Sequence, residues 1–374
     1  MQETSTLRAL QAASVNPDSY RATRRVLSEI EAESASVNFL FVSPASDLAR
    51  VSKALAEVAC GPMICCTTAG EVWRAEGHIK GGIVGASLSG VRARVWPIDD
   101  LQSFSESEAK QFVAQMREFR DSIEPGEAVS AVVLLDGLST SEERVASLLH
   151  GALDGVPIVG GAAGDDHNFE STKVLVNGAF EEGKGVVALI VTSSRTTTFM
   201  AHHFEPVGSR LVVTAADPAR RRIVELDGMP AAEAYRQATG FSSGLLTREV
   251  VAASPLLLPI GGRTYVRSLV GEADGSLDLY CAIEKGLVLQ VGRSTSLTRC
   301  LSSLIEDVQS KVGQPQLVVS FGCVLSSLEM AVCDRDDGVR KAFADNNFFG
   351  FRGYGQLFGG LAVNQTLTGI AFGR

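Results

Sequence analysis

The sequence predicts a mixed α/β protein with two sheet-containing subdomains, in which helices pack on mixed or antiparallel sheets. Three observations lead to this prediction. Amphipathic helical segments alternate with short apolar strands in both halves of the chain. Apolar residues make up 45% of the 374 residues, which is enough for a sizeable core and for two domains. The 37 glycines favour many tight turns between short elements.

The first half of the chain reads as helices and strands in alternation. Pro17 and Asp18 are start signals for the first helix, and Gly61 and Pro62 close the second. The apolar run at 130–137 is typical of a buried strand. The elements expected here are helices at 17–35, 47–62, 108–119 and 141–153, and strands at 37–44, 63–68, 81–90, 91–98, 130–137 and 156–164.

The second half begins with short strands separated by turns, which suggests an antiparallel meander. The strands expected there are 173–180, 185–193, 197–204, 209–216 and 221–228. Further on, we expect helices at 229–240 and 294–313, strands at 264–272, 275–283 and 316–325, and a pair of strands within 360–374. AVVLLDG at 131 and LVVSFGC at 317 occupy similar places in the two halves, which hints at a distant duplication.

Charge and hydropathy exclude several classes of partner. The formal net charge is −9 and the pI is about 5.2, which argues against binding to nucleic acid. No uncharged apolar run reaches the roughly 18 residues that cross a bilayer. The opening residues, MQETSTLRAL, lack the basic and apolar regions of a signal peptide. We therefore expect a soluble, cytoplasmic protein that does not contact a membrane.

The seven cysteines lie at 60, 65, 66, 281, 300, 323 and 333. No Cys-x-x-Cys pair and no histidine at zinc-finger spacing accompanies them, so a structural zinc site is not expected. Cys65 and Cys66 are neighbours in an expected strand, so one should face the core and the other a cavity or solvent. Buried filling of the core is the favoured interpretation, and a reactive thiol is the alternative.

Motifs of the common enzyme classes are missing. No Gly-x-Ser-x-Gly elbow, P-loop or dinucleotide fingerprint occurs, so we do not expect an enzyme. The glycine-rich IVGGAAGDD follows an expected strand and suits either a tight turn or the close approach of a ligand. Asp165 and Asp166 could cap that turn or bind a cation. His202 and His203 lie in an expected strand, so one should point inward and one outward.

Five motifs, taken together and in order, resemble the FIST family of sensory domains. They are SP…D at 43–47, CTTAGEV at 66–72, VGGAAGDD at 159–166, VTAADPARRRIVELDGMPAAEAY at 213–235 and FRGYGQLFGGLAVNQTLTGIAFG at 351–373. The resemblance covers roughly residues 35–373 and implies an N-terminal domain over 1–225 and a C-terminal domain over 226–374. It further implies a sensory protein that binds a small ligand and reports to a signalling partner.

One branch that resembles this family senses nitric oxide through haem and regulates histidine kinases (the NosP type). The resemblance therefore implies a stand-alone sensor that binds haem b, with nitric oxide as its ligand and a histidine kinase as its partner. A neutral histidine is the usual ligand of haem iron. The chain lacks Cys-x-x-Cys-His, so any haem is bound non-covalently. The residues expected at the haem are His203 or His202, then His167, as iron ligand, with Phe204, Phe169 and Met200 packing on the porphyrin.

The alternative is a receptor for a small polar metabolite, such as an amino acid. The residues expected to bind it are Gly161, Gly164, Arg352, Tyr354, Gln356, Asn364 and Thr366. Asn364 and Thr366 alternate with apolar residues in an expected strand and should share one face. Related sequences often have glutamate where Gln356 stands, and a neutral amide is a weaker partner for a ligand ammonium. Besides a histidine kinase and a small ligand, a second copy of the chain is a possible partner, which would give a homodimer.

Overall fold

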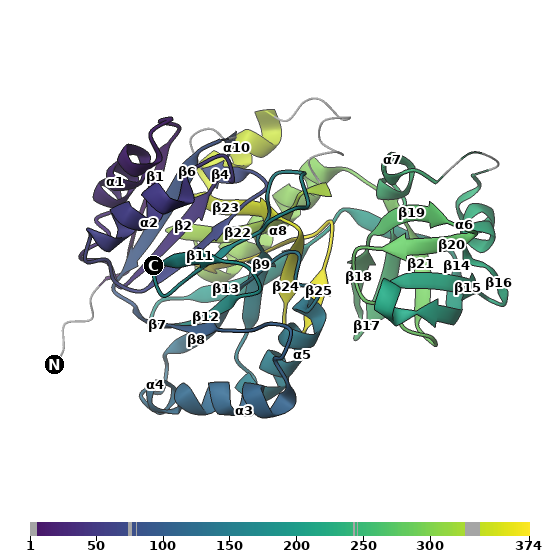
Figure 1. Cartoon of the computed structure of the whole chain (residues 1–374), viewed down its shortest axis with the longest axis horizontal. Helices are drawn as coiled ribbons and strands as arrows, with labels where there is room; N and C mark the ends of the chain where they lie inside the picture. Colours follow the sequence, from purple (N-terminus) through teal and green to yellow (C-terminus); the bar gives the residue numbers. More distant parts are fainter. Residues whose placement is uncertain (1–5, 74–76, 80, 242–243, 245, 326–336) are drawn as a thin grey trace.

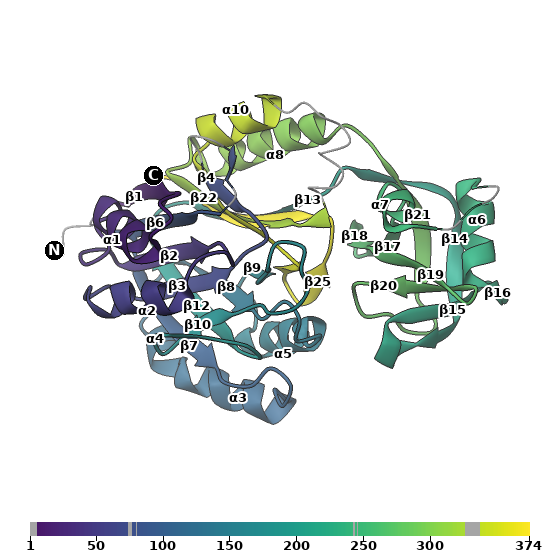
Figure 2. The same ribbon diagram turned by 45° about the horizontal axis from the view of Figure 1, so that its top comes forward.

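The computed structural model describes residues 6–73, 77–79, 81–241, 244, 246–325 and 337–374. Strands in these residues form four sheets with helices packed on them, so the predicted mixed α/β class is confirmed. Three sheets build one body, made of the chain up to residue 203 and from residue 295 onward (Figure 1). Residues 204–294 carry the fourth sheet and stand beside the body as an inserted unit (Figure 2).

The body consists of three chain segments with the same order of elements: strand, helix, central strand, helix, strand, hairpin and last strand. The first comprises β1 (Arg8–Ser14), α1 (Ser19–Glu29), β2 (Val37–Val42), α2 (Leu48–Ala56), β3 (Met63–Thr67), β4 (Glu71–Trp73), β5 (Gly77–Ile79) and β6 (Ile83–Ser89). The second comprises β7 (Arg92–Ile98), α3 (Glu106–Gln115), α4 (Arg117–Asp121), β8 (Ala128–Leu135), α5 (Glu142–Leu153), β9 (Ile158–Ala162), β10 (Val174–Val176), β11 (Ala179–Glu181) and β12 (Gly185–Thr192). The third comprises β13 (Thr196–Ala201), α8 (Leu297–Val312), β22 (Leu317–Cys323), α10 (Asp337–Asp345), β23 (Phe348–Gly353), β24 (Gly355–Phe358), β25 (Leu361–Val363) and β26 (Leu367–Phe372).

Each body sheet has a central strand that pairs in parallel on one side and antiparallel on the other. β2 pairs in parallel with β3, β8 with β9 and β22 with β23. The antiparallel neighbours are β6, β12 and β26. The similarity between the sequences at 131 and 317 thus has a structural counterpart, because β8 and β22 are both central strands. β2 is a third copy of the pattern that the sequence did not reveal.

The hairpins are exchanged between the three segments. The hairpin β4–β5 of the first segment extends the third sheet beside β23. The hairpin β10–β11 of the second extends the first sheet beside β3, and β24–β25 of the third extends the second sheet beside β9. Every body sheet is therefore completed by residues from another segment.

The three sheets share one apolar core between them. Phe41 stands at its centre, with its ring centroid 4.6 Å from that of Phe351 and 5.2 Å from that of Phe349. Helices cover the outer faces: α1 and α2 the first sheet, α3 and α5 the second, and α8 and α10 the third (Figure 2). All six residues of β2 are buried because both of its faces are covered, which explains its unbroken apolar sequence.

The inserted unit connects β13 to α8 and has its own core. Its sheet runs in the order β18-β17-β21-β14-β15-β20-β19, with β16 beside β15. Tyr235 of α6 is buried in the core beneath that sheet. The elements are β14 (Phe204–Asp217), η1 (Pro218–Arg220), β15 (Arg222–Leu226), β16 (Met229–Pro230), α6 (Ala231–Thr239), α7 (Arg248–Ala252), β17 (Leu256–Ile260), β18 (Arg263–Arg267), β19 (Leu269–Ala273), β20 (Ser276–Leu279) and β21 (Val288–Ser294).

The predicted meander after residue 173 is wrong. Its strands belong to all four sheets: β10–β11 to the first, β12 to the second, β13 to the third, and β14–β15 to the inserted unit. Apolar alternation identified the strands, whereas their partners come from distant parts of the chain. The strands β25 and β26 near the end of the chain likewise lie in different sheets. The division after residue 225 stays a prediction; in space, residues 204–294 form one unit.

Candidate functional site

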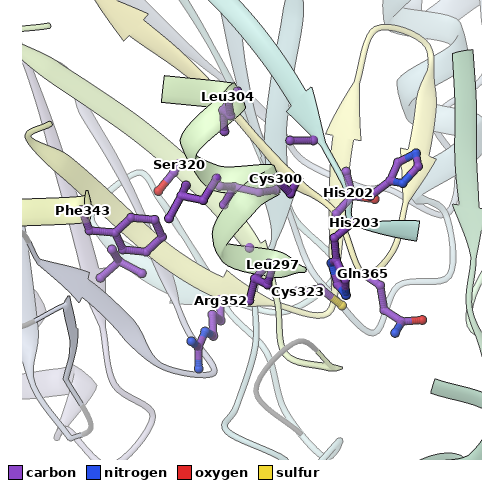
Figure 3. Close-up of a pocket in the computed structure, with 16 residues that line it drawn as sticks. His202, His203, Leu297, Cys300, Leu304, Ser320, Cys323, Phe343, Arg352 and Gln365 are labelled. Atoms are coloured by element: carbon purple, nitrogen blue, oxygen red, sulfur yellow. The ribbon is translucent and has the colours of Figure 1, made fainter. Parts of the chain in front are cut away.

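A cavity of about 70 Å³ lies beneath the first turns of α8, on the outer face of the third sheet (Figure 3). We call it the α8 pocket. Its apolar walls come from Val72, Leu297, Leu301, Leu304, Phe343 and Leu367. Ser320 and Gly322 of β22 line the cavity from the sheet, where a hydroxymethyl group and a bare Cα take up little space. A Cβ on Gly322 would meet its nearest neighbours at 3.6–3.9 Å, an ordinary contact distance.

Polar groups converge on this cavity from several elements, namely His202, His203, Arg352, Gln365 and Thr366. Burial lowers the pKa of Arg352 to about 10, so the guanidinium remains a cation at neutral pH in surroundings that disfavour charge. The Thr366 hydroxyl donates to the Asn364 carbonyl at 2.6 Å. The Gln365 amide is engaged on both sides, because it accepts from Ser268 Oγ at 2.7 Å and donates to the Ala252 carbonyl at 2.8 Å.

His202 and His203 lie in the connection between β13 and β14, not in a strand as predicted. His202 Nε2 donates to the Thr264 carbonyl at 3.0 Å, so Nδ1 is the nitrogen that accepts from Phe204 N–H. Both ring nitrogens are therefore used, and burial lowers the pKa of this histidine. His203 is 5% exposed, and its ring lies 4.4 Å from that of Phe204.

Four of the residues predicted at a haem line one surface groove beside the α8 pocket. Met200, His202, His203 and Phe204 all border this groove, which has a volume of about 420 Å³. Phe204 also packs against Leu257 and Val266 of the inserted unit. His167 is exposed in the loop after β9 and does not line the groove. Phe169 of that loop stacks on Tyr354 instead, at 4.3 Å between ring centroids.

The structure places only some of the residues predicted for the metabolite receptor at the α8 pocket. Arg352 and Thr366 line the α8 pocket, and Gln356 lies next to it, since its Nε2 donates to the Gly322 carbonyl at 2.8 Å. Gln356 Oε1 and Asn364 Oδ1 are buried and have no hydrogen-bond partner among the described residues. Asn364 and Thr366 belong to the connection between β25 and β26, so the prediction that they alternate in one strand is wrong.

Close packing against neighbouring residues accounts for the glycines of the glycine-rich segment. A Cβ on Gly161 would lie 3.0 Å from Phe351 Cζ, and one on Gly164 would lie 2.8 Å from Ala69 Cβ. Asp165 accepts from the backbone N–H groups of three residues that follow it and from the Tyr354 hydroxyl. Burial alone would raise the pKa of Asp165, but the hydrogen bonds to its carboxylate have the larger combined effect and lower the pKa below its ordinary value. The carboxylate therefore organises the loop, and no cluster of three or more metal-binding side chains occurs in the described residues.

The cysteines of MICCTT are structural. Cys65 packs beneath α1 and α2, whereas Cys66 belongs to the core between the three sheets. The expectation that one of them faces a cavity or solvent is wrong, because both are fully buried. Burial raises the pKa of both thiols well above the ordinary value, which disfavours the reactive thiolate. Cys333 lies outside the described residues.

Glu71 is a buried carboxyl group whose environment the sequence did not reveal. It is fully buried and accepts from Thr68 Oγ at 2.5 Å and from Gly82 N–H at 3.4 Å. Burial raises its pKa to about 7. The contact between Thr68 and Glu71 could have been expected from the sequence, because the two residues are only three positions apart. Sequence reasoning also missed a cluster of charges, described below, where the inserted unit meets the body.

Comparison with known proteins gives a family match over most of the chain. The FIST N domain matches residues 36–229, and the FIST C domain matches residues 231–358. No protein among the curated ones compared with it matches the chain. Among the helices of the described residues, none combines the length and the apolar character that a membrane span requires.

Proposed function

The chain belongs to the FIST family, and from this premise we propose that it is a sensory protein that binds a small carboxylate-bearing metabolite in the α8 pocket. One observation carries the proposal: a cation, Arg352, lies in the wall of a largely apolar cavity beside the two chain connections to the inserted unit. A few convergent polar groups in an apolar cavity are typical of small-molecule sites. We propose binding without catalysis.

The chemistry of the cavity limits the ligand. A carboxylate is the ligand group that a guanidinium in a largely apolar cavity favours, because the pair is held by charge-assisted hydrogen bonds. Gln356 lies next to the cavity, and its Oε1 has no hydrogen-bond partner among the described residues, which favours a ligand that also carries a donor, such as an amino group. The cavity has about half the volume of one that holds benzene, roughly 150 Å³, so the ligand has few heavy atoms.

A thermal-shift screen tests this proposal. The probes are the twenty common amino acids and the straight-chain monocarboxylates from formate to butyrate. We expect at least one to raise Tm by several degrees, because a ligand at 100 times its Kd stabilises the fold by about 2.7 kcal/mol. Arg352→Gln should abolish that shift. Arg299→Gln is the matched control, since Arg299 borders the neighbouring groove but not the pocket. The absence of a shift with every probe would refute the proposal.

A nitric-oxide sensor that binds haem b and regulates a histidine kinase is the second candidate. The specific observation in its favour is the groove of about 420 Å³ bordered by Met200, His202, His203 and Phe204. That volume is within the range of ligand pockets, roughly 300–1,000 Å³. The imidazoles, the apolar side chains and the cation of Arg299 fit a haem, whereas Glu205 and Asp307, which also border the groove, would repel its propionates. His203 is the proposed iron ligand, because it borders the groove and its ring lies 4.4 Å from that of Phe204, which would pack on the porphyrin. Haem iron would supply the site that binds nitric oxide.

Absorption spectra after haem reconstitution separate the two candidates. A haem sensor should show a sharp Soret band that shifts with nitric oxide and is lost in His203→Ala. Arg352→Gln should leave that band unchanged, because Arg352 does not border the groove. Diffuse haem binding that none of His203→Ala, His202→Ala and His167→Ala alters would rule out the haem candidate. The histidine kinase as partner rests on the family resemblance.

A further inference from the structure

We propose that the α8 pocket reports its occupancy by setting the position of the inserted unit, which a cluster of buried charges latches against the body. This inference rests on the proposed function, because it assigns the regulatory output of the same pocket. Three features support the inference. The pocket lies at the chain connections to the inserted unit, charged side chains join that unit to the body, and these charged side chains are incompletely hydrogen-bonded.

The α8 pocket is built on both chain connections to the inserted unit. His202 and His203 line it from the connection that leaves the body at the end of β13, and Leu297 and Cys300 line it just after the chain returns. The two connections are also bonded to each other, since the His203 carbonyl accepts from Thr295 N–H at 2.8 Å and from Thr295 Oγ1 at 2.5 Å. A ligand in the pocket would therefore contact residues of both chain connections at once, since His202, His203 and Leu297 all line the cavity (Figure 3).

Four charged side chains join the inserted unit to the start of α5, and we call them the latch: Glu142, Glu143, Arg221 and Arg267. Arg221 Nη1 lies 2.8 Å from Glu142 Oε1, and Arg267 Nη1 lies 3.1 Å from Glu143 Oε1. Glu143 Oε1 also accepts from Ala282 N–H of the inserted unit at 2.7 Å. Glu142 and Glu143 lie in the first turn of α5, where the helix dipole stabilises negative charge. The two carboxylates on the body are therefore held in place by their own helix.

The latch is buried but incompletely paired. All four side chains are at most 18% exposed. Glu142 Oε2 and Arg267 Nε make no hydrogen bond to any described residue. Burial, together with the neighbouring Glu142 carboxylate, raises the pKa of Glu143. The desolvation of buried ions offsets much of their attraction, so the latched state has little excess stability. A ligand that contributes a few kcal/mol to one position of the inserted unit can therefore shift the equilibrium.

Amide hydrogen exchange at Ala282 measures the latch directly, because its N–H is bonded to Glu143 only while the inserted unit is docked. The variant Arg221→Gln breaks pairs across the junction. The matched control is Arg222→Gln, because Arg222 pairs with Asp278 at 2.6 Å within the inserted unit and is similarly buried. In the full chain, we expect peptides containing Ala282 to exchange at least tenfold faster in Arg221→Gln and unchanged in Arg222→Gln. Equal exchange in the two variants would overturn the proposal.

Coupling to the pocket is tested with L-alanine and acetate as probes. Filling the cavity should hold both connections in the latched arrangement, so a bound probe should slow exchange at Ala282 in the wild type. Reciprocally, Arg221→Gln should raise the Kd of the probe about tenfold, and Arg222→Gln should not. A probe that binds without either effect would refute the coupling while leaving the proposed function intact.

Failure of both probes to bind would count against the proposed function, and a variant then tests the coupling without a ligand. Leu301→Phe places additional side-chain volume in the α8 pocket, with Leu301→Met as the volume-conserving control. We expect slower exchange at Ala282 in Leu301→Phe, provided that its Tm shows it to be folded. Unchanged exchange in the folded variant would overturn the inference.

Discussion

Replacing Glu71 with glutamine should make the stability of the protein less dependent on pH. Burial raises the pKa of Glu71 from 4.5 to about 7, so the folded state binds this proton more tightly than the unfolded chain does. The contribution to stability is fully present below pH 4.5 and is lost as the pH rises through 7. At about 1.4 kcal/mol per pKa unit, the contribution is about 3 kcal/mol.

The variant Glu71→Gln keeps the shape of the side chain and can still accept from Gly82 N–H and bond to Thr68. It should match the wild type at pH 4.5 and exceed its free energy of unfolding by about 3 kcal/mol at pH 8. Urea unfolding at pH 4.5, 6 and 8 measures this difference, and subtraction of the wild type removes the titration of all other groups. The exposed Glu29→Gln serves as the control. A difference that stays constant with pH would refute the reasoning.

Two further predictions concern packing and cysteine reactivity. Gly164→Ala should destabilise the fold by about 1–3 kcal/mol, because its Cβ would lie 2.8 Å from Ala69, whereas Gly151→Ala in open space on α5 should stabilise it by up to about 1 kcal/mol. Thermal unfolding of both variants measures this, and equal effects would contradict the packing argument. Iodoacetamide should leave Cys65 and Cys66 unmodified in the native protein and alkylate them in urea, because both are fully buried. Mass spectrometry locates the label, and modification of either thiol in the native state would contradict their assignment to the core.

The sequence predicted most of the elements but not their arrangement. Strands such as β2 and β8 were evident because burial on both faces requires unbroken apolar runs. The strand β1 was missed because alanine, glutamine and serine dominate RALQAAS, and its stability comes from pairing with β6. The exchange of hairpins has no local signal, since each hairpin pairs with a strand from another segment.

The candidate site shows the same limit. His202, His203, Arg352 and Thr366 were selected on motif and residue type, and the structure places all four around one cavity. Gly161 and Gly164 were selected on the same grounds, yet close packing accounts for them. Whether a selected residue lines a cavity or is closely packed depends on neighbours from elsewhere in the chain, such as Phe351 and Ala69. The latch was not predicted because its carboxylates and guanidiniums are about 80 or more residues apart in sequence.

The exchange of hairpins constrains how the chain can be made and divided. The second sheet receives its outer strands, β24 and β25, from residues 355–363, so it stays incomplete during synthesis until these residues have left the ribosome. Contacts of such long sequence separation slow folding, because the intervening chain must be ordered first. Until then, β9 presents an unpaired edge that another polypeptide could occupy. None of the three segments can be excised as an autonomous module, and a deletion of residues 355–363 would damage a sheet whose neighbouring strand, β9, lies about two hundred residues earlier.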